Sequence, residues 1–320
     1  MLLCGKFIWQ IPENQIAFVI ILKPKFIAGE AIMIFVTGGT GFVGSFIIRK
    51  LLAENKQIKA LRRKDSDVSL LTDISSAIDW VEGDITDITF LYEAMQGCEQ
   101  VIHAAAITDT SKKREEIFNT NVEGTANLVN ISLLQGIKKF CYISSVLTLG
   151  RKNEQIINEE SKWEESKYNS LYAQSKYAAE KEVSRAIAEG LNAIIVNPSL
   201  VLGLRNQDKS NSRFFEHIRQ ERPFYTHQQV NYVDVRDVAE AVFQLTFSEI
   251  SGENFILNAG SIPYKTLADQ TADLLGKKKP TMLLTPLMLQ MASRLEYLRS
   301  KLTGSRPLVT RETAMLSERK

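Results

Sequence analysis

A tyrosine and a lysine four positions apart, Tyr172 and Lys176, form a pattern with direct chemical meaning. Four residues make about one helical turn, so both side chains would lie on one face of a helix. A phenol with a pKa of about 10 is a poor general acid or base near neutrality, but a neighbouring ammonium stabilises the phenolate and lowers that pKa. The pair therefore predicts proton transfer by Tyr172, tuned by Lys176.

The same spacing occurs at two other places, Tyr177 with Lys181 and Tyr297 with Lys301, so the spacing alone is not specific. Tyr297 belongs to a late helical segment, far beyond the strands of the expected sheet. Tyr177 follows Tyr172 by five positions, which is about 140° around a helix, so the two cannot face one cofactor. Position along the chain has to decide between the three pairs.

The place of Tyr172 relative to an expected strand favours it as the catalytic residue. The apolar run Phe140–Ile143 reads as a strand, it ends in Ser144 and Ser145, and Tyr172 follows it by one loop. Ligands bind at the carboxyl ends of the strands in open parallel sheets. A serine hydroxyl at this strand end would hydrogen-bond the same substrate oxygen that Tyr172 protonates.

A glycine-rich segment from Thr37 to Gly44 provides a second chemical signal. Gly39, Gly41 and Gly44 satisfy the pattern G-x-G-x-x-G, and Gly38 with the last two satisfies G-x-x-G-x-x-G. The segment joins an expected strand to an expected helix, where glycines let a pyrophosphate approach the backbone and the helix N-terminus. We therefore expect a dinucleotide site whose contacts include Gly38, Thr40, Gly41, Phe42, Val43 and Gly44.

The end of the second expected strand indicates which dinucleotide is bound. An acidic residue about 20 residues after the glycines would hold a free ribose 2′-hydroxyl, but the sequence has Leu61-Arg62-Arg63 there. Two guanidinium groups suit a 2′-phosphate, so NADP(H) is favoured, with Arg62 as a contact. Asp65 lies near enough to keep NAD(H) as the alternative cofactor, and a solvated basic turn is the plain alternative to any cofactor contact.

Short apolar runs that alternate with amphipathic segments supply the elements that position these residues. The runs expected to be strands are 32–37, 58–61, 78–81, 101–106, 140–143 and 193–196. Strands that alternate with helices and are apolar on both faces are typical of a parallel sheet covered on both sides. We expect an α/β fold with a doubly wound parallel sheet, that is, a Rossmann fold.

The alternation weakens after about residue 200, which divides the chain. We expect a dinucleotide-binding core over residues 33–200. Over 201–320 we expect a smaller, irregular substrate-side lobe, with some strands and helices returning to the core. Residues 1–32 read as an extension outside the core, because Met33 leads directly into the first strand. Apolar residues at helical spacing from Met288 to Leu302 predict a late helix with a buried face.

Composition excludes several other classes of protein. The chain has 320 residues, of which 44% are hydrophobic and 24% charged, and its net charge of +2 favours neither nucleic acid nor a membrane surface as partner. Three cysteines without C-x-x-C spacing and three histidines predict neither a disulfide scaffold nor a zinc site. The apolar run Ile16–Leu22 is too short for a membrane span, which needs about 20 residues. We expect a cytoplasmic protein without a metal.

Taken together, these motifs resemble the extended short-chain dehydrogenase/reductases, the NAD-dependent epimerase/dehydratase superfamily. The resemblance covers residues 33–300 and is specific in combination, because the motifs occur in the order of the family. The matching segments are Thr37–Gly44, Gly83–Asp84, Val101–Ala106, Asn121–Asn127, Tyr142–Ser145, Tyr172–Lys176, Asn197–Gly203 and Val233–Ala239.

The resemblance implies roles for residues at several strand ends. The catalytic residues it implies are Ser145, Tyr172 and Lys176, with Tyr172 and Lys176 also touching the cofactor. It implies further cofactor contacts at Asp84 and Ile85 by the adenine, at Ala104 and Ala105, and at Pro198 and Ser199 over the nicotinamide. His103 and Asn121 match the family pattern too, and for both a structural role is favoured over proton transfer.

The segment Asn197–Gly203 indicates which branch of the family the chain resembles. It is closer to dihydroflavonol reductases and 3β-hydroxysteroid dehydrogenases than to nucleotide-sugar enzymes. Val146-Leu147 also follows Ser145 where dehydratases often carry acidic residues. This implies NAD(P)-dependent hydride transfer between nicotinamide and a small-molecule ketone or secondary alcohol. The alternatives are a nucleotide-sugar epimerase or dehydratase with tightly bound NAD, and a non-enzymatic dinucleotide sensor. The family also supplies the expectation of a homodimer.

Overall fold

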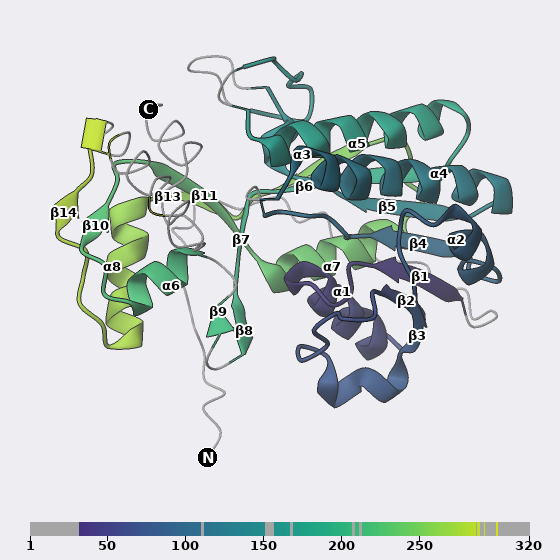
Figure 1. The fold of residues 1–320 in the computed structure, drawn as a ribbon, viewed down its shortest axis with the longest axis horizontal. Helices are drawn as coiled ribbons and strands as arrows, with labels where there is room; N and C mark the ends of the chain where they lie inside the picture. The colour runs from purple at the N-terminus through teal and green to yellow at the C-terminus, as the bar shows by residue number, and fades with distance from the viewer. Residues whose placement is uncertain are drawn as a thin grey trace.

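The computed structural model describes residues 32–109, 112–150, 157–166, 169–206, 209–210 and 213–285, together with positions 287, 288, 291 and 299. Its centre is a seven-stranded sheet in the order β12-β6-β5-β4-β1-β2-β3, and every pair of neighbours in it is parallel (Figure 1). The strands are β1 (Met33–Thr37), β2 (Gln57–Arg62), β3 (Asp79–Glu82), β4 (Gln100–His103), β5 (Lys139–Ile143), β6 (Ala193–Pro198) and β12 (Asn254–Leu257).

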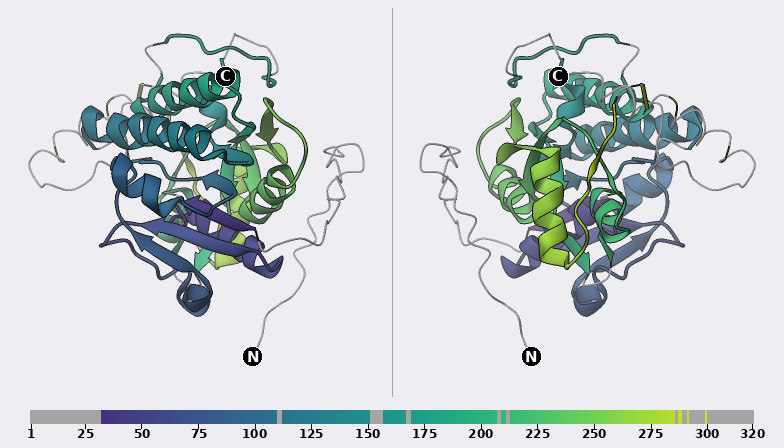
Figure 2. Two further views of the ribbon diagram at one scale, coloured as in Figure 1. Left: turned by 90° about the vertical axis from the view of Figure 1, so that its right-hand side faces the viewer. Right: turned by 90° about the vertical axis from the view of Figure 1, so that its left-hand side faces the viewer.

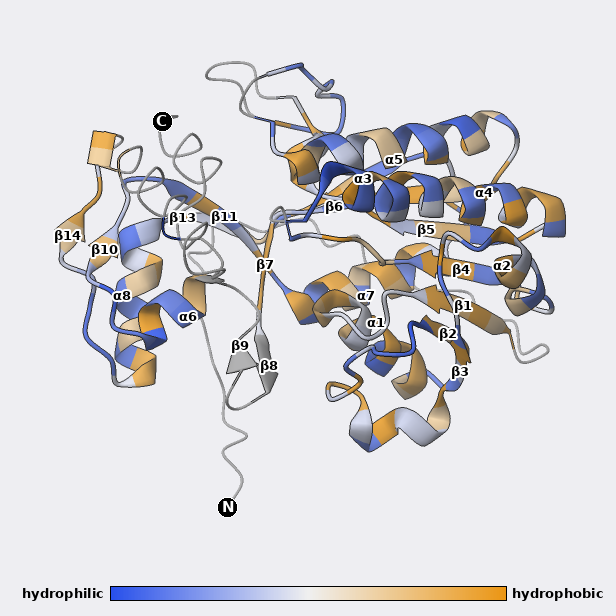
Figure 3. Ribbon diagram, in the orientation of Figure 1, coloured by the Kyte–Doolittle hydropathy of each residue, from blue (hydrophilic) through white to orange (hydrophobic). Residues whose placement is uncertain are grey.

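Helices cover both faces of this sheet, as Figures 1 and 2 show. One face packs against α1 (Phe42–Ala53) and α7 (Val235–Thr246), through side chains such as Ile48 and Val242. The other packs against α2 (Ile88–Ala94), α4 (Gly124–Gln135) and α5 (Leu171–Ala188), through side chains such as Leu128 and Val183. Figure 3 shows β1 and β4 as apolar, whereas the helices alternate between apolar and polar residues. The expected doubly wound parallel sheet is confirmed.

The remaining short elements connect these layers. They are the helical turns η1 (Thr72–Ala77), η2 (Asn119–Glu123) and η3 (Val146–Thr148) and the short helix α3 (Arg114–Phe118). The turn η2 is a π-type turn between α3 and α4, a feature that often marks functional sites.

All six expected strands are present, and two details of the expectation were wrong. The fourth strand, expected over 101–106, ends at His103 because the chain then leaves the sheet to pass beside the glycine segment at Ala104 and Ala105. A seventh strand, β12, was not expected. It is a half-buried edge strand that pairs with β6 alone in the sheet, so it lacks a continuous apolar run.

A smaller lobe follows β6 in the chain and lies beside one end of the sheet in Figure 1. It contains the sheet β13-β11-β7, formed by Gly260–Pro263, Gln229–Asp234 and Leu200–Leu202. Its other elements are β8 (Leu204–Asn206), β9 (Lys209–Ser210), β10 (Phe224–Tyr225), β14 (Met282–Leu283), α6 (Arg213–Arg219) and α8 (Tyr264–Leu275). A separate apolar cluster that includes Phe214 and Leu267 joins α6 to α8.

Parts of two expectations lie outside the described residues: the extension before residue 32 and most of the late helix. Of the apolar stripe expected to be buried on that helix, Met288 and Met291 are described, and they are 41% and 58% exposed. Burial is therefore not found at these two positions. Within the described ranges, no helix is long and apolar enough to cross a membrane, and His, Cys, Asp and Glu side chains form no metal-binding cluster.

Candidate functional site

The glycine segment between β1 and α1 is shaped by contacts that exclude side chains. Gly38 has a φ of +73°, and a Cβ there would overlap the backbone of Ala104 and Ala105 at the end of β4. A Cβ on Gly44 would overlap the carbonyl of Gly38. The loop therefore turns back tightly on itself and lies against β4, as the glycine spacing predicts.

The N-terminus of α1 faces this loop without a side-chain cap. Gly41 precedes the first helical residue, no side chain caps the helix there, and its first turn has no acidic residue. A Cβ on Gly41 would meet one atom within 4 Å, the carbonyl oxygen of Gly38 at 3.2 Å, so there is space in front of the loop. Uncapped N–H groups and the positive end of the helix dipole suit a pyrophosphate. Thr40, Phe42 and Val43 share this turn.

The end of β2 carries Arg62, which is only loosely held. Its guanidinium lies 3.6 Å from the Glu82 carboxylate and 5.8 Å from the centre of the Trp80 ring. Its Nε is buried, and no acceptor among the described residues takes a hydrogen bond from it. An additional anion would satisfy that donor. The following residue, Arg63, is exposed.

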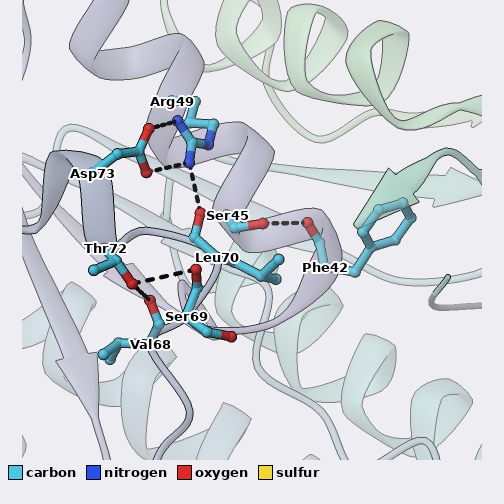
Figure 4. A network of polar contacts seen from close by, with 8 residues as sticks. All are labelled: Phe42, Ser45, Arg49, Val68, Ser69, Leu70, Thr72 and Asp73. Atoms are coloured by element: carbon cyan, nitrogen blue, oxygen red, sulfur yellow. Dashed lines mark hydrogen bonds and ion pairs between the residues drawn. The ribbon is translucent and has the colours of Figure 1, made fainter. Parts of the chain in front are cut away.

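The loop after Arg62 is tied to α1 by one arginine (Figure 4). Arg49 donates two hydrogen bonds of 2.7 and 2.6 Å to the Asp73 carboxylate and one of 2.7 Å to the carbonyl of Leu70. Thr72 donates back to carbonyls of the same loop, and Ser45 donates to the Phe42 carbonyl in the first turn of α1. These contacts fix the β2–η1 loop relative to the helix that begins at the glycine segment.

Asp84 and Ile85 follow β3, on the same edge of the sheet. The Asp84 carboxylate accepts from the backbone N–H of Thr86 at 2.9 Å and from its hydroxyl at 2.7 Å. Partial burial disfavours the charged form, but these hydrogen bonds outweigh it and lower the pKa of Asp84. Ile85 is buried against Gly124. The carboxylate thus stays ionised beside the expected adenine end of the site.

Helix α5 carries Tyr172 and Lys176 one turn apart. It begins after Ser170, whose hydroxyl caps the helix by accepting from the N–H of Ala173. Lys176 is buried, and its Nζ donates a 2.6 Å hydrogen bond to the carbonyl of Ile143 at the end of β5. Its ammonium also lies 4.1 Å from the centre of the Tyr142 ring. Burial lowers the pKa of Lys176 to about 7, and the charge of Glu180 opposes this.

The pKa of Tyr172 differs from the expectation. Burial raises it from 10.0 to about 12, whereas the sequence predicts a lowering by Lys176. The physical reason is that desolvation disfavours the phenolate, while the nearby amine donates to a backbone carbonyl and is itself weakly basic. Burial therefore favours the neutral phenol at Tyr172.

Ser145 is the second residue after β5 and caps the start of η3. Its hydroxyl accepts from the N–H of Leu147 at 3.3 Å, and it remains partly exposed. The neighbouring Ser144 is buried, and its N–H donates to the carbonyl of Val196 on β6. The structure thus brings Ser145 to the strand end that carries the Lys176 contact, with a more accessible hydroxyl than Ser144.

Pro198 and Ser199 end β6 beside β5. The N–H of Ser199 donates to the carbonyl of Leu257 on β12 at 2.9 Å. Its hydroxyl oxygen is buried, and no partner for it is found in the described ranges. A buried polar atom without a partner is uncommon. A polar group of a bound ligand at this strand end would provide the missing hydrogen bond to the Ser199 hydroxyl.

His103 forms a buried polar chain that the sequence does not reveal. Its Nδ1 lies 2.7 Å from the Thr37 hydroxyl and its Nε2 lies 2.9 Å from the Thr125 hydroxyl. Thr125 donates its own proton to the carbonyl of Asn121, so Nε2 is the donor and Nδ1 accepts from Thr37. Burial, followed by the charge of Lys176, holds the pKa of His103 well below its usual value. The expected structural role fits a neutral imidazole.

Asn121 connects the catalytic helix to the loop after β4. Its side-chain oxygen accepts from the N–H of Ile107 at 2.7 Å, while its side-chain nitrogen donates to the Ile107 carbonyl and to the Ser175 hydroxyl on α5. The amide therefore joins η2, this loop and α5. No sequence motif points to Ser175, and three-dimensional contacts alone reveal it.

The other two tyrosine–lysine pairs occupy different surroundings. Tyr177 stacks on Trp163 with ring centres 4.5 Å apart, and Lys181 Nζ lies 4.7 Å from the centre of the Tyr177 ring. Tyr297 and Lys301 lie outside the described residues. In sum, the carboxyl ends of β1, β4, β5 and β6 share one edge of the parallel sheet, and α5 adds the Lys176 amine there, with Tyr172 one turn earlier on the same helix.

Comparison with known proteins places this chain in a family. The profile of the "NAD dependent epimerase/dehydratase family" matches residues 34–260. A candidate dihydroflavonol 4-reductase from Synechocystis is 38% identical over 209 residues, which are 64% of this chain and 60% of that protein. A 3-beta-hydroxysteroid dehydrogenase from Mycolicibacterium neoaurum is 29% identical over 182 residues, which are 54% of this chain and 49% of that protein.

Solved structures give the same result for the fold. The crystal structure of gox2253 is 30% identical, with a TM-score of 0.75, and the match covers 91% of this chain and 88% of that one. UDP-glucose 4-epimerase from Thermotoga maritima is 21% identical, with a TM-score of 0.70 over 79% of this chain and 85% of that one, which shows the fold alone. The predicted resemblance is confirmed, and the chain belongs to the NAD-dependent epimerase/dehydratase family of extended short-chain dehydrogenase/reductases.

Proposed function

We propose that this protein is an oxidoreductase that transfers hydride between NADP(H) and a ketone or secondary alcohol of a small molecule. The observation that carries the proposal is the arrangement at the end of β5. A buried Lys176 on α5 is fixed by the Ile143 carbonyl at the strand end that leads into Ser145, and Tyr172 lies one turn earlier on the same helix. A phenol, an amine and a hydroxyl at one strand end are the groups that carbonyl reduction needs.

The residues present fit a dinucleotide. Its phosphates would be held by the uncapped start of α1, by the space in front of Gly41 and by the unpaired Nε of Arg62. Ser199, with its unpartnered hydroxyl, follows the carboxyl end of β6 on the same edge of the sheet. The bound nucleotide supplies or accepts the hydride. The protein's part in reduction is to hold the carbonyl oxygen with the Ser145 hydroxyl and to deliver a proton to it from the Tyr172 hydroxyl. Lys176, when protonated, stabilises the phenolate that remains.

The proposal of NADP(H) rather than NAD(H) depends on the end of β2. Arg62 and Arg63 stand where an acidic residue would hold a free 2′-hydroxyl. The long 3.6 Å contact of Arg62 with Glu82 leaves its guanidinium free to take a second anion. A 2′-phosphate would provide two charges for this pair of arginines.

The names of relatives support a carbonyl or alcohol substrate. They include a candidate dihydroflavonol 4-reductase, a 3-beta-hydroxysteroid dehydrogenase and a cinnamoyl-CoA reductase. Each name describes a reductase or a dehydrogenase. The chain spans about half to two-thirds of the length of these curated relatives, so the substrate of the whole protein is proposed only at the level of this class.

The test is NADPH oxidation by purified protein with a panel of ketones and aldehydes. We expect turnover by wild type, with kcat lower by a factor of at least about 100 in Tyr172→Phe. Tyr177→Phe is the matched control, since it removes a hydroxyl five positions away and preserves the stacked ring. Equal rates in wild type and Tyr172→Phe would overturn the proposal. Tightly bound NAD that is not consumed would instead identify an epimerase.

A further inference from the structure

A buried carboxylate lies behind the proposed catalytic residues, one helical turn beyond Lys176. Glu180 is 8% exposed and faces the interior from α5. Its Oε1 accepts a 2.6 Å hydrogen bond from Asn197 on β6 and a 2.9 Å hydrogen bond from Thr148 at the end of η3. Glutamate is rarely buried unless it is paired, so this position calls for an explanation that helix packing does not provide.

The hydrogen bonds of Glu180 reach three of the segments that carry the proposed site. The Thr148 hydroxyl, at the end of the short turn that begins at Ser145, also lies 2.8 Å from the Ser145 carbonyl oxygen, so its single proton is shared between that carbonyl and Glu180. Asn197 donates to the same carbonyl at 3.2 Å and directly precedes Pro198. One carboxylate thus joins α5, the Ser145 turn and the end of β6. Its displacement would move all three segments relative to one another.

Glu180 also interacts electrostatically with the buried ammonium of Lys176. Lys176 is buried, and its described polar contacts are the neutral Ile143 carbonyl and the face of the Tyr142 ring. A buried ammonium persists only with a compensating charge. The charge of Glu180 favours protonation of Lys176, and the charge of Lys176 in turn favours ionisation of Glu180.

We propose that Glu180 is a positioning residue of the active site, which holds the Ser145 turn against α5 and provides the counter-charge that keeps Lys176 protonated. The inference rests on the proposed function for its meaning in catalysis. Its electrostatic part concerns the folded protein alone and can be measured without a substrate.

The groups around the pair define what a pH titration reports. On β5, Tyr142 lies close to the charges of both Glu180 and Lys176. On β4, the charge of Lys176 lowers the pKa of the neutral His103. On β6 and η3, Asn197 and Thr148 do not titrate. Burial lowers the pKa of Lys176 to about 7 and raises that of Glu180, so near neutral pH the titration of Lys176 is the transition that Glu180 controls.

The first experiment follows the ¹³Cε resonance of Lys176 by NMR in the full-length protein labelled with ¹³C-lysine, assigned by its loss in Lys176→Arg. In Glu180→Gln, which preserves the side-chain shape, we expect the titration midpoint of Lys176 to fall by about one pH unit or more. The matched control is Glu182→Gln, which removes a half-buried carboxylate that pairs with Arg185 on the same helix. In this control, the titration midpoint of Lys176 should equal that of wild type.

A second variant covers the case in which Glu180→Gln does not fold. Thr148→Val is nearly isosteric and removes one hydrogen bond to the carboxylate without removing its charge. It should make Glu180 easier to protonate and move the Lys176 midpoint in the same direction by a smaller amount. An unchanged midpoint in whichever of the two variants folds overturns the proposal, whatever the protein reduces.

Kinetics supply the link to catalysis. With a carbonyl that wild type reduces, kcat of Glu180→Gln should be low at pH 7 and recover toward the wild-type value as the pH is lowered by about the shift of the midpoint. A purely structural role would lower kcat at every pH and would contradict the inference. If wild type reduces no carbonyl, the proposed function fails, while the titration still decides the electrostatic role of Glu180.

Discussion

Lys176 Nζ and the carbonyl oxygen of Ile143 are joined by a 2.6 Å hydrogen bond. This bond fastens the middle of α5 to the last residue of β5, directly before Ser144 and Ser145. The amine is thereby held at the strand end where a substrate oxygen is expected, and α5 is fixed in rotation about its axis. Tyr172, one turn earlier, shares that fixed face.

Substitution of Lys176→Met should separate catalysis from packing. The methionine keeps an apolar stem over Tyr142 but leaves the Ile143 carbonyl without its donor, which costs about 1–3 kcal/mol in the free energy of unfolding. The kcat for carbonyl reduction should fall by a factor of at least about 100, because the phenolate loses its ammonium. Urea unfolding and NADPH oxidation measure the two effects. Lys181→Met, on the same helix, should leave kcat unchanged; wild-type kcat in Lys176→Met would contradict the assigned role.

The buried imidazole of His103 predicts a loss of stability in acid. Its pKa is held well below the usual 6.5 by burial, so below pH 6.5 the unfolded chain binds a proton that the folded protein does not. Stability is therefore fully present above this pH and is lost as the pH falls, by up to about 1.4 kcal/mol per pH unit.

His103→Gln tests this, because glutamine can still donate to Thr125 and accept from Thr37 without titrating. Urea unfolding between pH 7 and 5 should show a smaller loss of stability for the variant than for wild type. Parallel curves would show that His103 has the same pKa in the folded protein as in the unfolded chain, contrary to the assigned neutral imidazole.

Gly44→Ala should weaken dinucleotide binding. The added Cβ overlaps the carbonyl of Gly38, so the glycine segment must open and its N–H groups move away from the phosphates. Such overpacking costs about 1–3 kcal/mol, and NADPH affinity measured by fluorescence should fall at least about tenfold.

Gly97→Ala is the matched control for Gly44→Ala. Unlike Gly44, Gly97 has a positive φ, +75°, but a Cβ there meets no atom within 4 Å. We expect a modest loss of stability from backbone strain and unchanged NADPH affinity. Equal NADPH affinity in Gly44→Ala and wild type would show that the segment does not hold the cofactor.

Arg62→Ala should alter cofactor preference rather than cofactor binding in general. Hydrogen bonds to charged groups contribute about 1.5–3 kcal/mol, so the Kd for NADPH should rise about 10- to 100-fold while the Kd for NADH stays within a factor of about 3. Isothermal titration with both cofactors measures the difference. Arg222→Ala removes a partly buried arginine that hydrogen-bonds Gln220 in the smaller lobe, and it should change neither Kd. An equal effect on both cofactors would remove the basis for NADP(H) preference.

The sequence by itself determined the core of the fold. Apolar runs such as Ile34–Val36 and Phe140–Ile143 are buried on both faces, and periodicity detects such strands because it depends on neighbouring residues alone. The glycine spacing likewise predicted the tight turn at Gly38, because the backbone itself requires the missing Cβ. The edge strand β12 escaped detection because its four residues are only half buried.

The tertiary structure decided which charges and protons the site contains. Glu180, Asn197 and Thr148 meet across separations of 17 to 49 residues, which no local pattern encodes. The spacing of Tyr172 and Lys176 placed both on one helix face, yet their pKa values depend on how much protein surrounds them and which carbonyls lie within reach. Desolvation is a property of the assembled interior, and for this reason the sequence could predict which groups react, while the fold set their pKa values.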